Sequence, residues 1–143
     1  MPATFPLDIV TPERTVLSEE VTSLQVPAVD GSLGILAGHA PLLAELGVGD
    51  CVVRLSTGAE EHLALAGGFV EVSRERVTVL ADTAEFSHEI DPDRAEQTLA
   101  RARELLGSVN ETPDRVELAA SVQRAQNRLR IARGGGSAAA GQP

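Results

Sequence analysis

The chain has 143 residues, 43% of them hydrophobic, with one Cys, no Trp or Tyr and a formal net charge of −9. This composition favours one domain, or a small domain with an appendage, around an aliphatic core and without a disulfide framework. The acidic balance argues against nucleic-acid binding. No apolar run approaches the roughly 20 residues that span a bilayer, so we expect no direct membrane insertion. No secretory signal pattern opens the chain, which predicts a cytoplasmic protein.

The first 90 residues are predicted to be short strands separated by turns. Nine apolar runs recur, with period-two alternation at Val70/Val72 and Val77/Val79 and breaks at Asp30-Gly31 and Gly67-Gly68. Short strands at this spacing, with no helical stretch between them, predict a small all-β sandwich or barrel. The runs are Phe5–Val10, Arg14–Leu17, Val21–Pro27, Ser32–Leu36, Leu42–Leu46, Cys51–Leu55, His62–Ala66, Phe69–Ser73 and Arg76–Ala81.

The segment Ile90–Ala95 marks a boundary between two modules. Asp91 can accept hydrogen bonds from the free N–H groups of a first helical turn, and Pro92 is tolerated at the first helical position. The net charge changes here too: residues 1–90 hold 14 acids and 4 Arg (−10), and residues 91–143 hold 7 acids and 8 Arg (+1). We predict a β domain over residues 1–90, a helical hairpin over 91–133 and a disordered tail over 134–143.

Two helices are predicted after the boundary. The first runs from Pro92 to Leu106 and ends at a left-handed Gly107. The second starts near Thr112, runs to about Arg133 and turns back antiparallel, because the connection is short. Its apolar seam is narrow and rich in Ala, so the hairpin is a plausible two-state element; a permanently docked hairpin fits the same pattern. The predicted faces are Ala95, Leu99, Ala102 and Leu106, and Leu118, Val122, Ala125, Leu129 and Ala132.

Arginines share faces on both predicted helices. Arg94 and Arg101 are seven residues apart, and Arg124 and Arg128 are four apart, where like charges are mildly unfavourable. Neither Arg124 nor Arg128 has an acid three or four residues before it. We therefore expect a partner from the first helix, from another protein or from a bound anion; simple solvation is the alternative.

The glycine-rich stretch Gly31–Leu43 stands apart in the β half, with His39 at its tip. No Ser or Cys nucleophile motif accompanies His39, which argues against catalysis, and the three scattered His residues do not indicate a metal site. The alternatives that stay open are a loop that docks on another protein and a His that hydrogen-bonds its own loop.

Four segments carry a resemblance to a known family: Leu7–Pro12, Gly34–Leu43, Gly67–Val72 and Val77–Ala84. Together they resemble the epsilon subunit of bacterial F-type ATP synthase, over about residues 4–133. The resemblance implies a ten-stranded β-sandwich followed by an antiparallel two-helix hairpin. It also implies a non-catalytic rotor subunit of the central stalk, peripheral on the cytoplasmic face of the plasma membrane, whose sandwich binds the gamma subunit and docks on the c-subunit ring.

The resemblance also implies site residues. Ring docking is expected of Asp30, Gly38 and His39, because this chain has Ser32 where family members often have an acidic residue. Ile90–Ala95 is similar to an ATP-binding motif of the family, which implies ATP as a regulatory ligand and no tightly bound cofactor. Without a Walker-type loop, we expect binding without hydrolysis. The ligands implied are Glu85, Asp91, Arg94, Ala95, Arg101, Arg124 and Arg128.

The resemblance further implies that the subunit inhibits ATP hydrolysis when the ATP concentration falls. The helices would extend and engage the catalytic alpha and beta subunits through Arg124, Arg128, Arg130 and Arg133. Three alternative hypotheses remain for the function of the chain. It could be a structural coupling module with immobile helices, a nucleotide sensor outside any complex, or an enzyme with a β-sandwich active site. The sequence shows no nucleophile–base pair for the last of these.

Overall fold

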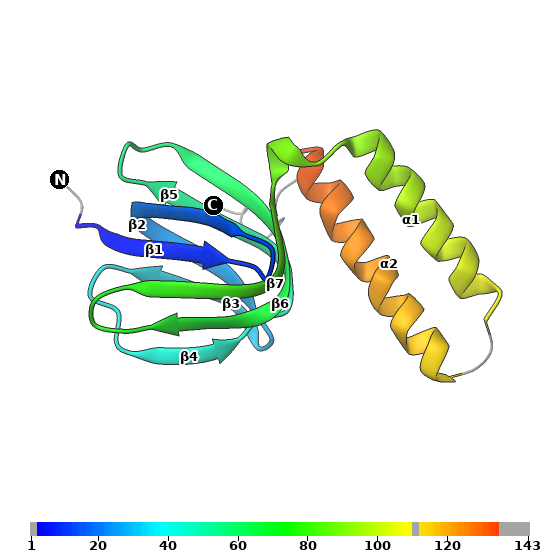
Figure 1. Ribbon diagram of the computed structural model, residues 1–143, viewed down its shortest axis with the longest axis horizontal. Helices are drawn as coiled ribbons and strands as arrows, with labels where there is room; N and C mark the ends of the chain where they lie inside the picture. Colours follow the sequence, from blue (N-terminus) through cyan, green and yellow to red (C-terminus); the bar gives the residue numbers. More distant parts are fainter. Residues whose placement is uncertain (1–2, 110–111, 135–143) are drawn as a thin grey trace. The chain divides into compact units, whose positions relative to one another are not determined.

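The computed structural model describes residues 3–109 and 112–134 (Figure 1). It divides into two units, the first ending at Phe86 and the second beginning at Ser87. The second unit holds a 3-10 helix η1 (Ser87–Glu89) and the helices α1 (Pro92–Gly107) and α2 (Thr112–Ala132). The first unit holds the strands β1 (Phe5–Val10), β2 (Thr15–Ala28), β3 (Gly31–Leu36), β4 (Leu42–Glu45), β5 (Val48–Leu55), β6 (Glu60–Val72) and β7 (Val77–Phe86).

The strands form a sheet that closes on itself around an apolar core. Their order is β1-β7-β6-β5-β2-β3, β4 pairs with β6, and β1 also pairs with β2. The β1–β7 pairing is parallel, and the other pairings between strands are antiparallel. Alternate residues along each strand point inward, and Leu7, Ile9, Leu65 and Val79 are at most 1% exposed. The buried cluster is aliphatic except for Phe5 and Cys51, as predicted.

The described residues form seven strands, so the predicted count of ten is not confirmed. Ser18–Glu20 joins two predicted runs within β2, and Gly67-Gly68 joins two within β6. One edge of β6 pairs with β5 as far as Ala66 and with β4 from Phe69 onward. Its other edge pairs with β7 on both sides of the glycines, in one register. The pairing with β7 therefore keeps β6 continuous through Gly67-Gly68, although these two glycines locally favour a turn.

The helix α1 begins as predicted. The Asp91 carboxylate accepts hydrogen bonds from the backbone N–H groups of Asp93 (3.0 Å) and Arg94 (3.4 Å), and Pro92 opens the helix. This arrangement satisfies N–H groups that have no partner within the helix. Asp91 therefore fixes where α1 starts.

The C-terminal end of α1 differs from the prediction. Gly107 belongs to the helix and has no positive φ, so the predicted left-handed cap is wrong. Arg115 Nη1 instead donates to the carbonyl oxygens of Leu106 (2.9 Å) and Val109 (3.2 Å). Because a side chain from α2 satisfies these carbonyls, a left-handed glycine is not needed.

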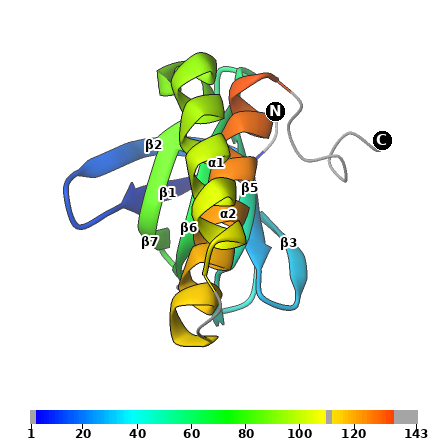
Figure 2. The ribbon, with the colours of Figure 1, turned by 90° about the vertical axis from the view of Figure 1, so that its right-hand side faces the viewer.

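Helices α1 and α2 lie side by side as an antiparallel hairpin (Figures 1 and 2). Ala95, Leu99 and Ala125 are buried, as the predicted faces require. The prediction of a single narrow apolar seam on α2 is wrong, because Asn127 and Ile131 are also buried. They lie about 120–160° round the helix from Ala125. Most of the predicted tail, residues 135–143, lies outside the described residues.

Candidate functional site

A groove of about 360 Å³ lies between α1 and α2, within the second unit. Three guanidinium groups line it, from Arg101, Arg124 and Arg128, and none of its lining residues is acidic. Guanidinium groups suit phosphate oxygens, and the apolar side chains suit an uncharged part of a ligand. The groove thus brings together three of the seven residues predicted to bind ATP. The other lining residues are Thr98, Ala102, Leu105, Leu118, Ser121 and Ala125.

The arginines of the groove differ in their partners. Arg124 Nη2 lies 3.2 Å from Glu117 Oε2 and 3.1 Å from Ser121 Oγ. The expectation that its partner comes from outside α2 is therefore wrong. Residues seven apart return to nearly the same helix face, so an acid seven residues away can also be a partner. Arg128 makes an interaction, whereas Arg101 makes no side-chain hydrogen bond or ion pair within the described ranges.

The other residues predicted to bind ATP do not line this groove. The Oδ1 atom of Asp91 caps α1, and Ala95 is 1% exposed. Arg94 is exposed, and Glu85 lies in β7, in the first unit. The second unit by itself therefore groups only the three arginines.

Two further arginines were predicted to make inhibitory contacts. Arg133 Nη2 lies 3.2 Å from Glu96 Oε1, an ion pair between the end of α2 and α1. Arg130 Nη2 donates to Asn127 Oδ1 at 2.6 Å. The Arg133–Glu96 contact needs the two helices side by side, so it would be lost if they separated.

The residues predicted to dock on the c-ring lie at opposite ends of β3. Asp30 is in the tight turn between β2 and β3, where Ala28 pairs with Gly31. Gly38 and His39 follow the other end of the strand, and His39 Nδ1 donates to the Ala40 carbonyl oxygen at 2.7 Å. Six strand residues span about 20 Å at roughly 3.3 Å each. The structure therefore does not bring Asp30 and His39 into one loop.

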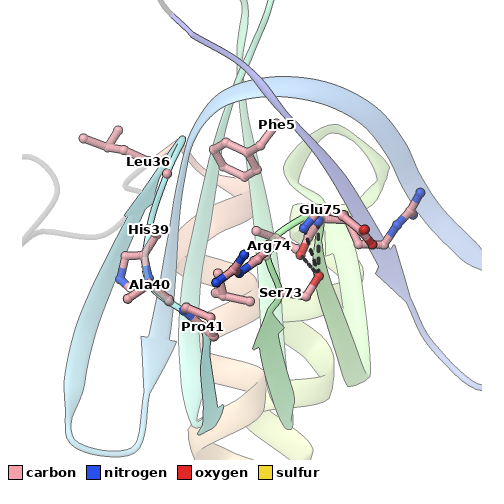
Figure 3. A pocket seen from close by; sticks show the side chains of 12 residues that line it. Phe5, Leu36, His39, Ala40, Pro41, Ser73, Arg74 and Glu75 are labelled. Atoms are coloured by element: carbon pink, nitrogen blue, oxygen red, sulfur yellow. Dashed lines mark hydrogen bonds between the residues drawn. The ribbon is translucent and has the colours of Figure 1, made fainter.

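A hollow of about 240 Å³ lies at the His39 end of β3 (Figure 3). The residues Leu36 and Gly38–Pro41 line it together with the turn Ser73–Arg76. Ser73 Oγ accepts hydrogen bonds from the N–H groups of Glu75 (3.3 Å) and Arg76 (3.2 Å), which holds this turn in shape. Two of the four Arg residues of the acidic first 90 residues are in this turn, beside Glu75.

His62 lies at the centre of a polar network that no sequence motif indicated. His62 Nδ1 lies 3.0 Å from Asp50 Oδ2, and Nε2 lies 3.2 Å from Glu60 Oε1. Arg54 Nη2 pairs with Glu60 at 2.8 Å. Partial burial lowers the pKa of His62, but the hydrogen bonds and charges of Asp50 and Glu60 outweigh it and raise that pKa above 6.5. Only the β5–β6 register brings these residues together, so no sequence spacing indicated the network.

The sandwich is expected to lose stability as the pH rises above 6.5, through the raised pKa of His62. Below 6.5 the imidazole is protonated in both folded and unfolded chains, so its full stabilisation is present. Above 6.5 the unfolded chain releases its proton first, which favours unfolding. Urea unfolding at several pH values should show this slope for the parent chain and for His39→Gln, but not for His62→Gln. An equal slope in His62→Gln would contradict the assignment.

No helix in the described parts of the chain is long and apolar enough to cross a membrane. The same residues hold no group of three or more His, Cys, Asp or Glu side chains that could bind a metal ion.

Cys51 is fully buried, and burial, followed by the charge of Asp50, raises the pKa of its thiol. A buried thiol with a raised pKa is a poor nucleophile.

Comparison with known proteins gives matches over almost the whole chain. Residues 4–87 match the model of the ATP synthase delta/epsilon chain β-sandwich domain, and residues 88–133 match the long α-helix domain of the same chain. The ATP synthase epsilon chain of Solibacter usitatus is 45% identical over 133 residues, covering 92% of this chain and 98% of that one. The epsilon chain of Bacillus pumilus is 47% identical over 131 residues, covering 90% and 97%.

The fold also matches a solved structure. A chain of the Euglena gracilis mitochondrial ATP synthase superposes with a TM-score of 0.77 at 23% identity, covering 89% of this chain and 80% of that one. At this identity the match supports the fold alone. It agrees with a β-sandwich followed by two helices.

Proposed function

This chain belongs to the ATP synthase delta/epsilon chain family, and on that premise we propose that it is the non-catalytic epsilon subunit of the central stalk of a proton-translocating F-type ATP synthase. In this role it couples gamma to the c-ring and inhibits ATP hydrolysis through a mobile hairpin that senses ATP. It acts as a peripheral subunit at the cytoplasmic face of the plasma membrane. One observation supports ATP sensing: Arg101, Arg124 and Arg128 line the same groove.

An exposed apolar surface on the sandwich supports a protein partner there. Phe69 and Leu80 are paired residues of β6 and β7, and they are 48% and 51% exposed. Val10 pairs with Leu80 in turn, so the three residues form a row across three strands. Exposed apolar groups that gather in this way are typical of interaction surfaces. We assign gamma binding to the sandwich on this basis.

The c-ring contact is proposed for the Asp30 end of β3. Asp30 is exposed at the tip of a two-residue turn, and Val29 beside it is 56% exposed. Because Gly38 and His39 lie at the other end of the strand, the three proposed ring residues form two contact points. A ring surface that meets the sandwich at one end touches only one of them.

The hairpin supplies the regulatory part of the proposal. ATP held by the groove arginines keeps α1 and α2 together, with Asp91, Arg94, Ala95 and Glu85 as the further proposed ligand residues. When ATP falls, the helices extend, and Arg124, Arg128, Arg130 and Arg133 engage acidic surface on the catalytic alpha and beta subunits. The same arginines then have different partners in the two states, which a switch requires.

Calorimetric titration with ATP tests this site. We expect micromolar binding by the parent chain, and a loss of affinity of about tenfold or more in Arg101→Ala, because this change removes charged hydrogen-bond donors to phosphate from the groove. Arg103→Ala is the matched control, since Arg103 is exposed on α1 and does not line the groove. No binding by the parent chain at millimolar ATP would contradict ATP sensing and leave the rotor role in place.

A structural coupling module is the second candidate. The Arg133–Glu96 ion pair and the contacts of Arg115 with the end of α1 hold the helices together without a ligand, which favours immobile helices. For such a module, an Arg124→Ala/Arg128→Ala double variant would leave both ATP affinity and inhibition unchanged. Co-purification with gamma would separate either role from that of a nucleotide sensor outside any complex.

A further inference from the structure

Glu117 is an acidic side chain that contacts one of the groove arginines, Arg124, although Glu117 does not itself line the groove. Its Oε2 atom lies 3.2 Å from Arg124 Nη2, and Ser121 Oγ lies 3.1 Å from the same nitrogen. Each terminal nitrogen of a guanidinium carries two N–H bonds. Glu117 and Ser121 therefore use both hydrogens of Nη2, on an arginine that faces the groove.

A phosphate group at Arg124 would have to displace one of these contacts to bind both terminal nitrogens. The carboxylate would also repel the phosphate, because both are negatively charged. The Glu117 side chain is 72% exposed and that of Arg124 is 40% exposed. Water screens an ion pair as exposed as this one, so a ligand can break it.

We propose that Glu117 competes with the phosphates of the ligand for Arg124, and so sets the nucleotide affinity of the groove. This inference rests on the proposed ATP site. The Glu117–Arg124 contact lies within α2, so it does not itself depend on α2 packing against α1. Glu117 is thus a residue that tunes affinity, without itself contacting the ligand. It shifts the ATP concentration at which the hairpin would respond.

The test is titration of the full chain with ATP and, separately, with inorganic tripolyphosphate. Glu117→Gln is expected to bind both about two- to fivefold more tightly than the parent chain, the effect of removing one exposed competing charge. Glu104→Gln is the matched control, because Glu104 is an exposed acid of the same hairpin that does not line the groove. It should change the affinity by less than about twofold.

A double-mutant cycle shows whether the effect passes through Arg124. In an Arg124→Ala background, Glu117→Gln should no longer tighten binding, because the shared partner is gone. Glutamine and glutamate have similar helix propensities, so circular dichroism should report an unchanged helix content.

Three outcomes would overturn the proposal. If the parent chain binds and Glu117→Gln binds no more tightly than Glu104→Gln, Glu117 is not a competitor, and the ATP site stands. If Glu117→Gln still tightens binding in the Arg124→Ala background, the effect is general electrostatics. If neither the parent chain nor Glu117→Gln binds ATP or tripolyphosphate, the groove is not an anion site, and the ATP-sensing function fails as well.

Discussion

Replacing Gly68 with alanine is expected to destabilise the sandwich by about 3 kcal/mol or more. Gly68 has φ +112°, a conformation that residues with a Cβ atom rarely adopt. An added Cβ would lie 2.0 Å from the Leu80 carbonyl oxygen and 2.8 Å from the Ala81 Cα atom, both backbone atoms of β7. These atoms cannot move without breaking the hydrogen bonds between β6 and β7. Backbone strain and steric overlap therefore both destabilise the Gly68→Ala variant.

Two other glycines provide graded controls for this prediction. Gly58 also has a positive φ, +93°, but nothing lies within 4 Å of its added Cβ, so Gly58→Ala isolates the backbone strain. We expect it to cost about 1–2 kcal/mol. Gly34 has neither a positive φ nor a close neighbour, so Gly34→Ala should be nearly neutral. Urea unfolding of the three variants checks this order, and a Gly68→Ala variant as stable as Gly34→Ala would contradict the close approach of β6 to β7.

Removing residues 91–143 is expected to raise the ATP hydrolysis rate of the assembled complex several-fold and to leave assembly intact. The truncation removes all four arginines proposed to contact the catalytic subunits. It leaves the buried cluster of the sandwich whole, since that cluster lies between Phe5 and Ala84. The first measurement compares the ATP hydrolysis rates of complexes reconstituted with the full and the truncated chain. The second tests assembly by co-purification of the truncated chain with gamma.

A shorter truncation serves as the control for the proposed inhibition. Removing only residues 135–143 keeps both helices and should leave hydrolysis unchanged. If the complex with the longer truncation hydrolyses ATP no faster than the full complex, the hairpin is not inhibitory. If the longer truncation fails to co-purify with gamma, the sandwich alone does not account for assembly.

The placement of the candidate site could be predicted from sequence only in part. The spacing of Arg101, Arg124 and Arg128 assigns each to a helix face, and the short connection predicts that α1 and α2 are antiparallel. Which faces of the two helices meet at the groove is shown only by the structure. The contact between Glu117 and Arg124 spans two helical turns, which a rule for adjacent turns does not include. The His62 network depends on the pairing of β5 with β6, which places Asp50 beside His62 although the two are 12 residues apart in the chain.

Three features can be read from the amino-acid sequence alone: the β-then-α order, the start of α1 after its cap Asp91, and the aliphatic core. These features depend on local rules: which side chain can cap a helix, which residues alternate, and which apolar types are present. Three other features appear only in the folded chain: β2 and β6 are each continuous, Asn127 and Ile131 are buried, and Asp30 and His39 lie at opposite ends of β3. The reason is that strand continuity and burial depend on neighbours distant in the chain, whose hydrogen bonds and packing override a local turn or polar signal.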